Sequence, residues 1–215
     1  MTRTRQALLL VILLIGISGS ATAAPIISFT PAGSSVTGAG VTGTFGWQFD
    51  VVASGGITVT HLGLLDHASN GLAQPHQVSI WNNAGTLLAT GGVPAGTVAP
   101  LDVNGLFRLV DIVDVLLPQA AGYRIGAYYL ASSPDYWYQA AQVGGLQVNP
   151  AIQYVGARYA IGSTITDPIQ PSPNGPGPFG ASFQIADVVV TPEPSTLLLL
   201  GIGLLGVGAR LKRRV

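Results

Sequence analysis

The sequence predicts an all-β fold, an antiparallel β-sandwich of the jelly-roll-like kind, flanked by an N-terminal signal helix and a short C-terminal transmembrane helix. Three observations lead to this prediction. Bulky apolar residues alternate with polar ones in short runs, turn-forming residues separate the runs, and an uncharged apolar stretch lies near each end of the 215-residue chain. Period-two alternation is typical of strands with one buried face, and many short strands separated by Gly and Pro are typical of sandwiches. The expected parts are a signal peptide over 1–23, an N-terminal linker or first strand over 24–44, the sandwich over 45–187, a linker over 188–196, and a C-terminal helix with a basic tail over 197–215.

Each predicted strand has one apolar face, and turn signals stand between the strands. Asn-Gly pairs at Asn70-Gly71, Asn104-Gly105 and Asn174-Gly175, together with Asn83-Ala-Gly85, supply the backbone conformations that hairpins and loops need. No sustained helical stripe with caps occurs between 25 and 190, and the five prolines between 167 and 178 predict an irregular loop before the last strand. The residues expected to share a buried face are Phe45, Trp47, Phe49 and Val51; Ile57 and Val59; Val78 and Ile80; Tyr123, Ile125, Ala127 and Tyr129; and Ala181, Phe183 and Ile185.

The formal net charge of zero hides a segregation of charge along the chain. Six of the nine basic residues flank the two apolar ends. Residues 25–190 therefore keep three arginines against eight aspartates, with no Lys and no Glu, a formal charge of about −5. A protein that binds nucleic acid needs a basic stripe against the phosphates, so nucleic acid is excluded as a partner of this domain.

The chain contains no cysteine. This excludes thiol catalysis, cysteine-ligated zinc and iron–sulfur clusters, and we expect no cofactor. A domain of this size can bury enough apolar surface to be stable without disulfides, so the absence does not contradict export.

The N-terminus has the three parts of a secretory signal peptide. Arg3 and Arg5 precede an apolar stretch of eleven residues over 7–17, and small residues end in Ala21-Thr22-Ala23. An apolar stretch of this length is too short to span a bilayer, and a small-residue cleavage motif follows it where a signal needs one. The predicted cleavage lies between Ala23 and Ala24. The alternative interpretation is a buried helix.

The C-terminus combines a rigid spacer, an apolar run and a basic end. The prolines of Pro192-Glu193-Pro194 keep the chain extended, residues 197–209 carry no charge, and four basic residues follow within 210–214. Thirteen residues form a helix of roughly 20 Å, which is shorter than the roughly 30 Å hydrocarbon core. The basic end is expected to stay cytoplasmic, which places residues 24–190 outside. A short anchor after a spacer is typical of a tail that is read and removed, and an ordinary single-pass anchor is the alternative.

Taken in this order, Pro192-Glu193-Pro194, the apolar helix and the Arg-rich end resemble the PEP-CTERM sorting signal of Gram-negative bacteria, over about residues 190–215. The resemblance implies that an exosortase processes the tail at the inner membrane and that the protein then reaches the cell-envelope surface or the extracellular matrix. It also implies an association with exopolysaccharide.

Several segments of the middle domain are also similar to known sequences, namely Leu62-Gly-Leu-Leu-Asp66, Gly71-Leu72, His76-Gln-Val-Ser-Ile-Trp81, Gly85-Thr-Leu-Leu-Ala89, Phe107-Arg108, Gly122-Tyr-Arg-Ile-Gly-Ala-Tyr-Tyr129 and Phe179-Gly-Ala-Ser-Phe183. Together they loosely resemble an uncharacterised β domain common in PEP-CTERM proteins, and a β module found attached to carbohydrate-active enzymes. This resemblance implies a sandwich and assigns no activity.

All three histidines of the chain lie within sixteen residues, so a metal site has to be considered. Asp66, His67 and His76 are the weak candidates for ligands, with His61 nearby. The histidine spacing matches no established zinc motif, and Asp66 to Gly71 offers too few carboxylates for a calcium loop. His61 and His76 share parity with the apolar residues of their strands and are expected to point inward. We therefore predict hydrogen-bonded structural histidines and no metal.

Tyr136, Trp137 and Tyr138 could form an aromatic platform for a carbohydrate. Sugar rings present apolar C–H faces that pack on aromatic rings, and Asp135 could accept hydrogen bonds from hydroxyl groups. Adjacent residues of a strand face opposite ways, however, so one or two of the three rings are expected in the core.

No catalytic motif stands out. The three G-x-G-x-x-G matches reflect the 29 glycines, and paired carboxylates such as Asp111 and Asp114 can be judged only from their geometry. We predict a non-enzymatic surface or matrix protein. The alternatives are a carbohydrate-binding module and, as a third hypothesis, an Asp-dependent hydrolase.

Overall fold

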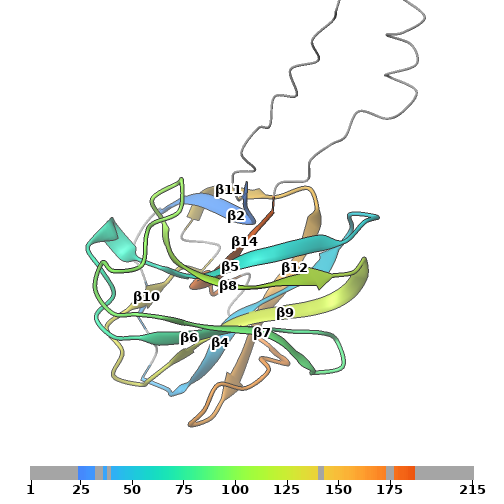
Figure 1. Ribbon diagram of the computed structural model, residues 1–215. Coiled ribbons are helices and arrows are strands. Elements are labelled where there is room, and N and C mark those ends of the chain that lie inside the picture. Colours follow the sequence, from blue (N-terminus) through green and yellow to red (C-terminus); the bar gives the residue numbers. More distant parts are fainter. Residues whose placement is uncertain (1–23, 32–35, 38–39, 140–142, 173–176, 187–215) are drawn as a thin grey trace, which may run out of the picture.

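The computed structural model describes residues 24–31, 36–37, 40–139, 143–172 and 177–186, and these form an all-β structure with antiparallel sheets (Figure 1). The antiparallel all-β fold predicted from the alternation is confirmed. The elements are β1 (Ala24–Pro25), β2 (Ile27–Pro31), β3 (Val36–Thr37), β4 (Gly43–Val51), β5 (Ile57–Leu65), the 3₁₀ helix η1 (His67–Ser69), β6 (His76–Trp81), β7 (Leu87–Val93), β8 (Phe107–Leu117), β9 (Ala120–Tyr129), β10 (Tyr136–Trp137), β11 (Val143–Val148), β12 (Ile152–Ile161), β13 (Gln170–Pro171) and β14 (Ala181–Ile185).

Parts of the sequence prediction lie outside the described residues. These are the signal helix with Ala23 of its cleavage site, the turn at Asn174-Gly175, the Pro192-Glu193-Pro194 motif and the C-terminal helix. Within the described ranges, no helix is long and apolar enough to cross a membrane.

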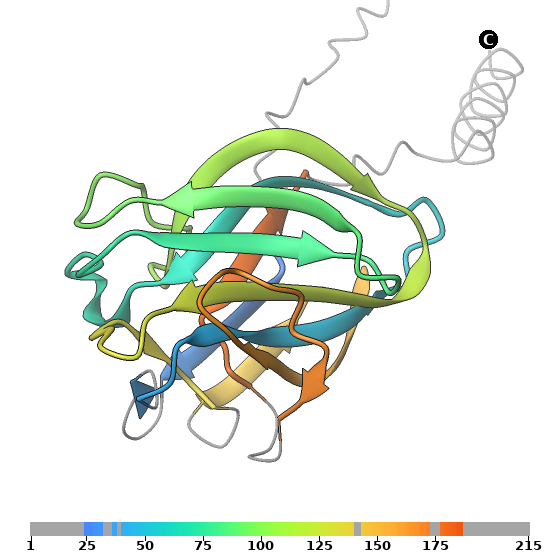
Figure 2. The ribbon, with the colours of Figure 1, turned by 90° about the horizontal axis from the view of Figure 1, so that it is seen from below.

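Two sheets pack face to face as a sandwich. The larger has the strand order β13-β12-β4-β9-β6-β7 and the smaller has the order β1-β14-β5-β8. Along the chain, β4, β5, the β6–β7 hairpin, β8 and β9 alternate between the two sheets, so most consecutive strands face each other across the core instead of pairing. Figure 2 shows the larger sheet from below, with the segment that follows β12 crossing its outer face.

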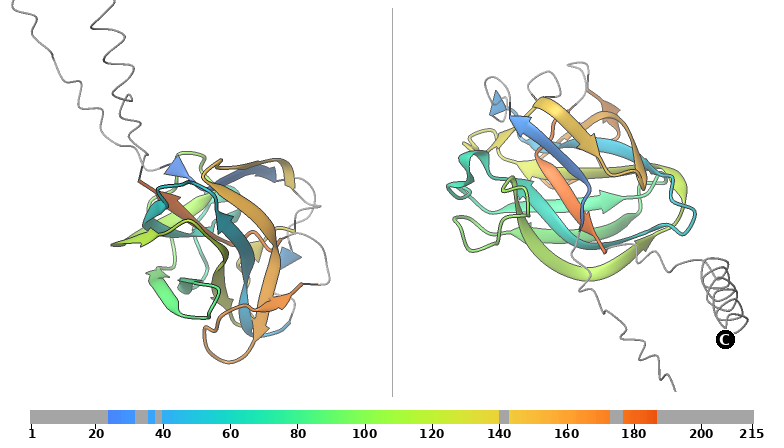
Figure 3. Two further views of the ribbon diagram at one scale, coloured as in Figure 1. Left: turned by 90° about the vertical axis from the view of Figure 1, so that its right-hand side faces the viewer. Right: turned by 90° about the horizontal axis from the view of Figure 1, so that it is seen from above.

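The first strands close one side of the sandwich. Ala24 of β1 pairs with Ile185 of β14, and β2 pairs with β11. Between them, the N–H of Ile26 donates to the carbonyl of Phe183 at 3.2 Å, and the N–H of Asn149 donates to the carbonyl of Ile26 at 2.9 Å. This segment therefore links the smaller sheet to the strand that precedes β12 (Figure 3). Residues 24–44, expected as a linker or first strand, contain β1, β2 and β3 and the start of β4.

The predicted apolar faces meet in one core. All of their residues are buried except Phe45, which is half-buried and packs against the rest. Phe183 of β14 stacks on Trp47 of β4 with the ring centroids 6.0 Å apart, and the indole Nε1–H of Trp47 donates to the carbonyl of Ala181 at 2.9 Å. Ring packing and a buried hydrogen bond thus join the two sheets at the same place.

One predicted orientation is wrong, because His61 does not point into the core. A β-bulge between Val59 and His61 shifts β5 against both of its neighbours, so that Val59 and Leu62 face inward. An inserted residue exchanges the two faces of a strand from that point on. The His61 side chain is 31% exposed, and its Nε2 lies 4.0 Å from Oδ1 of Asp111.

The described part of the chain begins and ends at one place on the sandwich, and its long loops lie at another. Ala24 and Ile185 pair beside Val59, and the N–H of Ala186 donates to the carbonyl of Thr58. Six residues further along β5, roughly 20 Å away in an extended strand, the segments 66–75, 94–106 and 130–138 leave the sheets. We refer to these three segments as the loop end.

Gly46 and Gly126 oppose each other on the paired strands β4 and β9, and Gly46 yields a test of the packing. A methyl group on Gly46 would overlap the carbonyl oxygen of Ile125, whereas one on Gly92 of β7 would meet nothing within 4 Å. We expect Gly46→Ala to lower the free energy of unfolding by about 2 kcal/mol, a fall in Tm of several degrees, because overpacking forces backbone shifts. Gly92→Ala is the matched control and should leave Tm within a degree or so. Thermal unfolding followed by circular dichroism measures both, and equal effects of the two substitutions would contradict the packing described here.

Candidate functional site

The loop end brings together most of the polar and aromatic residues that the sequence singled out. Asp66 and His67 follow β5, His76 opens β6, and Asp135 and Tyr136 follow β9. In Figure 1 these segments lie around β10, on the left of the molecule. Buried polar contacts hold the three loops together, as described next.

Arg108 of β8 forms the first buried charge pair. Its Nε donates to Oδ2 of Asp66 at 2.8 Å, and the two side chains are only 6% and 1% exposed. The guanidinium also donates to the carbonyl of Ala99 at 2.9 Å and to that of Ser69 at 3.3 Å. The Asp66 carboxylate in turn accepts the N–H of Gly71 at 2.9 Å. One arginine thus fixes two of the loops to β8, through a charge-assisted bond of the strong kind.

His76 and Asp135 form the second buried pair. Nε2 of His76 lies 2.8 Å from Oδ2 of Asp135, and Nδ1 lies 2.8 Å from the carbonyl oxygen of Tyr128. Both ring nitrogens face acceptors while Asp135 is ionised, so both contacts are hydrogen bonds only if both nitrogens carry a proton. The carboxylate also accepts the N–H groups of Ala73 at 2.8 Å and Gln74 at 3.1 Å. The pair therefore joins the segments 66–75 and 130–138.

The environment of Asp135 sets the pKa of its carboxyl. Burial acts to raise this pKa, but the hydrogen bond from His76, the N–H groups of Ala73 and Gln74, and the charge of His76 together hold it below its ordinary value. The same carboxylate acts on Tyr129, whose pKa is raised mainly by burial and further by the charge of Asp135. Asp135 is thus ionised and Tyr129 is neutral at neutral pH.

His67 and Tyr136 are the half-buried rings of the loop end. Their ring centroids lie 4.9 Å apart, and Nδ1 of His67 lies 2.6 Å from the hydroxyl of Tyr138, which fixes the imidazole. His67 opens η1, where Ala68 and Ser69 have φ values of 64° and 55°. Residues other than glycine adopt this left-handed conformation at a cost of order 1–3 kcal/mol each, so the surrounding contacts hold the turn that presents His67.

The three consecutive aromatic residues do not form one surface platform. Trp137 is 4% exposed and stacks on Phe45 with the centroids 4.8 Å apart, and Tyr138 is 1% exposed and packs edge-on against Phe29. Two of the three rings therefore belong to the core, as expected. Tyr138 has the parity of Tyr136 but lies beyond the end of β10, where it pairs with Phe179, so the alternation does not extend to it. Of the three rings considered for a carbohydrate, Tyr136 is the accessible one.

The metal-ligand candidates Asp66, His67 and His76 do not converge. Within the part of the chain that the structure describes, no three His, Asp or Glu side chains come close enough together to hold a metal ion. The carboxylate of Asp66 faces Arg108, and the ring of His76 faces Asp135. These side chains serve as structural partners.

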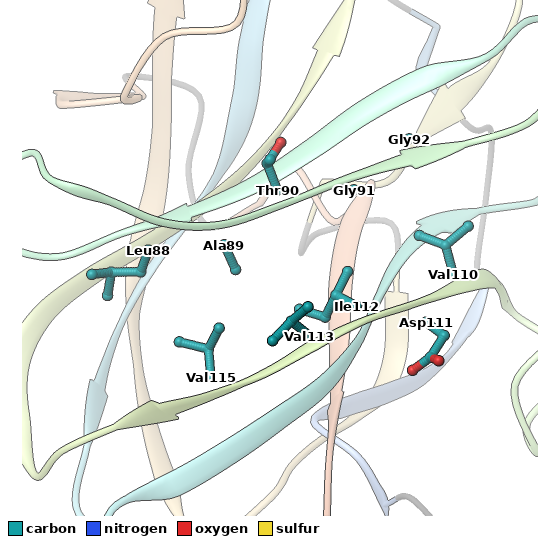
Figure 4. Close-up of a pocket in the computed structure, with 10 residues that line it drawn as sticks. All are labelled: Leu88, Ala89, Thr90, Gly91, Gly92, Val110, Asp111, Ile112, Val113 and Val115. Atoms are coloured by element: carbon teal, nitrogen blue, oxygen red, sulfur yellow. The ribbon is translucent and has the colours of Figure 1, made fainter.

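A groove of about 340 Å³ runs between the edge strands β7 and β8 (Figure 4). Its walls are mainly apolar, and Thr90 and Asp111 are the polar side chains that line it. Asp114, which the sequence paired with Asp111 for hydrolysis, does not line the groove. Both carboxylates are exposed on β8, so they lack the buried setting that separates the acid and base roles of such a pair.

Sequence reasoning missed the partners of the buried arginines. Arg108 pairs with Asp66, and Arg124 donates to both oxygens of Asp167 at 2.6 Å. An arginine inside an apolar strand of a lysine-free domain is a usable signal for a buried pair, because an unpaired buried charge is costly. The partners lie 42 and 43 residues away along the chain, so spacing alone could not identify them.

The Arg108–Asp66 pair can be tested by removing one partner. We expect Asp66→Ala to lower the free energy of unfolding by about 3 kcal/mol, because it leaves a buried guanidinium without its counter-charge. The exposed Asp111→Ala is the control and should change stability by less than about 0.5 kcal/mol. Urea titration measures both, and a small effect of Asp66→Ala would show that the carbonyl partners suffice for Arg108.

The lowered pKa of Asp135 predicts a specific pH dependence. Its contribution to stability is complete above the pKa of the unfolded chain, about 3.9, and is lost as pH falls through the lower folded pKa. The urea midpoint of the protein should therefore fall more steeply below about pH 4 than that of Asp135→Asn. Parallel pH profiles of the two proteins would contradict the assignment.

Comparison with known proteins identifies the C-terminal segment. Residues 190–214 match the family model described as the PEP-CTERM protein-sorting motif, which confirms the resemblance of this segment. No curated protein and no solved structure gives a significant match. The all-β architecture fits the uncharacterised β domain that the middle of the chain resembles. The chain therefore carries a PEP-CTERM sorting motif, which marks it for export, transit through the membrane to the cell surface and processing by an exosortase-type enzyme.

Proposed function

We propose that this is a non-enzymatic protein of the cell surface or extracellular matrix, delivered by its sorting motif and associated with exopolysaccharide. The observation that carries the proposal is the motif over 190–214. The signal peptide expected over 1–23 agrees with it, because the two ends together describe a route from the cytoplasm to the outside.

The use of the charged side chains supports a structural role over a catalytic one. At the loop end, Asp66 is neutralised by Arg108, and Asp135 is paired with His76. Each of these pairs is closed by backbone contacts and fixes loops in place. General acid–base catalysis needs a titratable group within reach of a substrate, and these side chains are buried away from solvent. The exposed pair Asp111 and Asp114 keeps an Asp-dependent hydrolase as the remotest alternative.

A carbohydrate-binding module is the alternative that a specific observation favours. Tyr136 is half-buried and lies against the half-buried His67, so two partly exposed rings with polar groups lie together at the loop end. Such a combination suits the mixed apolar and polar surface of a sugar. Under this alternative the exported domain would hold a glycan without changing it.

Deletion of residues 190–215 tests the delivery part of the proposal. We expect the shortened protein to be lost from the cell-surface and matrix fractions, because the enzyme that reads the tail no longer has its signal. Fractionation of the native cells followed by immunoblotting measures this. Replacement of Gln153 by Ser, which is exposed on β12 and lies outside the loop end, is the control and should leave the distribution unchanged.

The intact mass of the protein from each fraction completes the test. A species that begins near Ala24 and ends near Pro194 supports removal of both ends. A species that retains Val215 in the inner membrane, together with an unchanged distribution of the deletion variant, would contradict delivery by the sorting motif.

A further inference from the structure

We infer that the loop end is a pre-organised binding surface for an uncharged, hydroxyl-rich polymer, a neutral glycan, with His67 and Tyr136 as its central contacts. The inference deepens the proposed surface role and rests on it only for the location of the protein. Four properties of the loop end carry it, and each comes from the geometry above.

The first property is position. The chain enters at Ala24 and leaves at Ala186, both beside the start of β5. The loop end follows the other end of the same strand, at Leu65. Attachment through either terminus, before or after processing, therefore leaves the loop end free to meet a large ligand.

The second property is rigidity. Arg108 ties the segments 66–75 and 94–106 to β8, and Asp135 ties the segments 66–75 and 130–138 to each other. The hydroxyl of Ser69 adds a bond to the carbonyl of Gly105 at 2.7 Å. Loops that are already ordered lose little conformational entropy when they bind, which favours recognition of a flexible polymer.

The third property is the lack of surface charge. The charged residues within the three segments are Asp66, Asp102 and Asp135, which are 3%, 6% and 6% exposed. The groups that remain at the surface are amides, hydroxyls and short apolar side chains, as at Ser69 and Asn70. A charged polymer would find no counter-charge here, so the surface selects an uncharged ligand.

The fourth property is the pair of rings. Tyr136 lies 4.9 Å from His67, and the hydroxyl of Tyr138 holds Nδ1 of the same imidazole at 2.6 Å. The pair offers an aromatic face for sugar C–H groups beside polar groups for sugar hydroxyls. The ring orientation is fixed before any ligand arrives.

Affinity electrophoresis of the full chain, processed in its native cells, tests the inference. The probes are neutral dextran, mannan and xylan and the anionic polymer alginate, each cast into the gel. We expect at least one neutral polymer to retard the protein and alginate to have no effect. Tyr136→Ala should weaken the retardation at least tenfold in apparent dissociation constant, and His67→Gln several-fold. The control Tyr159→Ala removes a half-buried tyrosine of β12 and should bind like the parent.

His67→Gln keeps a polar partner for the Tyr138 hydroxyl, so it serves if Tyr136→Ala fails to fold, and thermal unfolding checks both variants. Retardation by none of the neutral polymers, retardation by alginate alone, or unchanged retardation of both folded variants would each overturn the inference. If the protein is sorted correctly but no polymer retards it, this inference is wrong and the proposed delivery still stands. If a neutral polymer retards the protein but deletion of residues 190–215 does not change its distribution among the cell fractions, this inference stands and the delivery proposal is wrong.

Discussion

The packing of Phe183 between Trp47 and Phe49 is the interaction on which the rest of the structure depends. The ring centroids of Phe183 lie 6.0 Å from Trp47 and 5.1 Å from Phe49, and the indole N–H of Trp47 reaches the backbone of the same strand, at Ala181. With no cysteine in the chain, no disulfide can join the sheets, so core packing joins them, and this contact between β4 and β14 is part of it. It also fixes β14, on which β1 and the exit of the chain depend.

The outer face of the larger sheet is covered by the segment that follows β12, which contains Asp167 and Pro168. Gly46 and Gly126 oppose each other on β4 and β9, and the side chain of Pro168 lies over Gly126. Arg124 then holds the covering segment through both oxygens of Asp167. A bidentate pair of this kind gives geometry as well as energy. Aromatic rings therefore stabilise the inner face of the sheet. On the outer face, the glycines leave room for the covering segment, and the ion pair between Arg124 and Asp167 holds that segment in place.

The strands could be predicted from the sequence because their apolar alternation is a local property. Trp47 and Ile125 face the core, as their parity requires. The prediction failed at His61, where one inserted residue in β5 exchanges the faces and leaves no mark in the pattern. The alternation placed one or two of the three aromatic rings at 136–138 in the core, but it could not show that Tyr138 is buried, because its pairing with Phe179 comes from elsewhere in the chain. The buried pairs of the loop end are non-local in the same way, and the residue types alone could suggest only that partners exist.

The buried pairs explain how an aspartate-rich domain can present an uncharged loop end. A buried carboxylate needs a counter-charge or hydrogen bonds. Asp66 has the guanidinium of Arg108 and the N–H of Gly71, and Asp135 has hydrogen bonds with His76 and the N–H groups of Ala73 and Gln74. A hydrophobic replacement could stabilise the fold equally well, but it would not reach the backbone of three separate loops, as Arg108 and Asp135 do. The charges are thus retained because they order the loops, and because they are buried, the surface is left to amides, hydroxyls, the valines Val98 and Val103, and the rings of His67 and Tyr136. The order of the loop end and the burial of Asp66 and Asp135 therefore have one physical origin, so a substitution at either residue should change the shape of this surface.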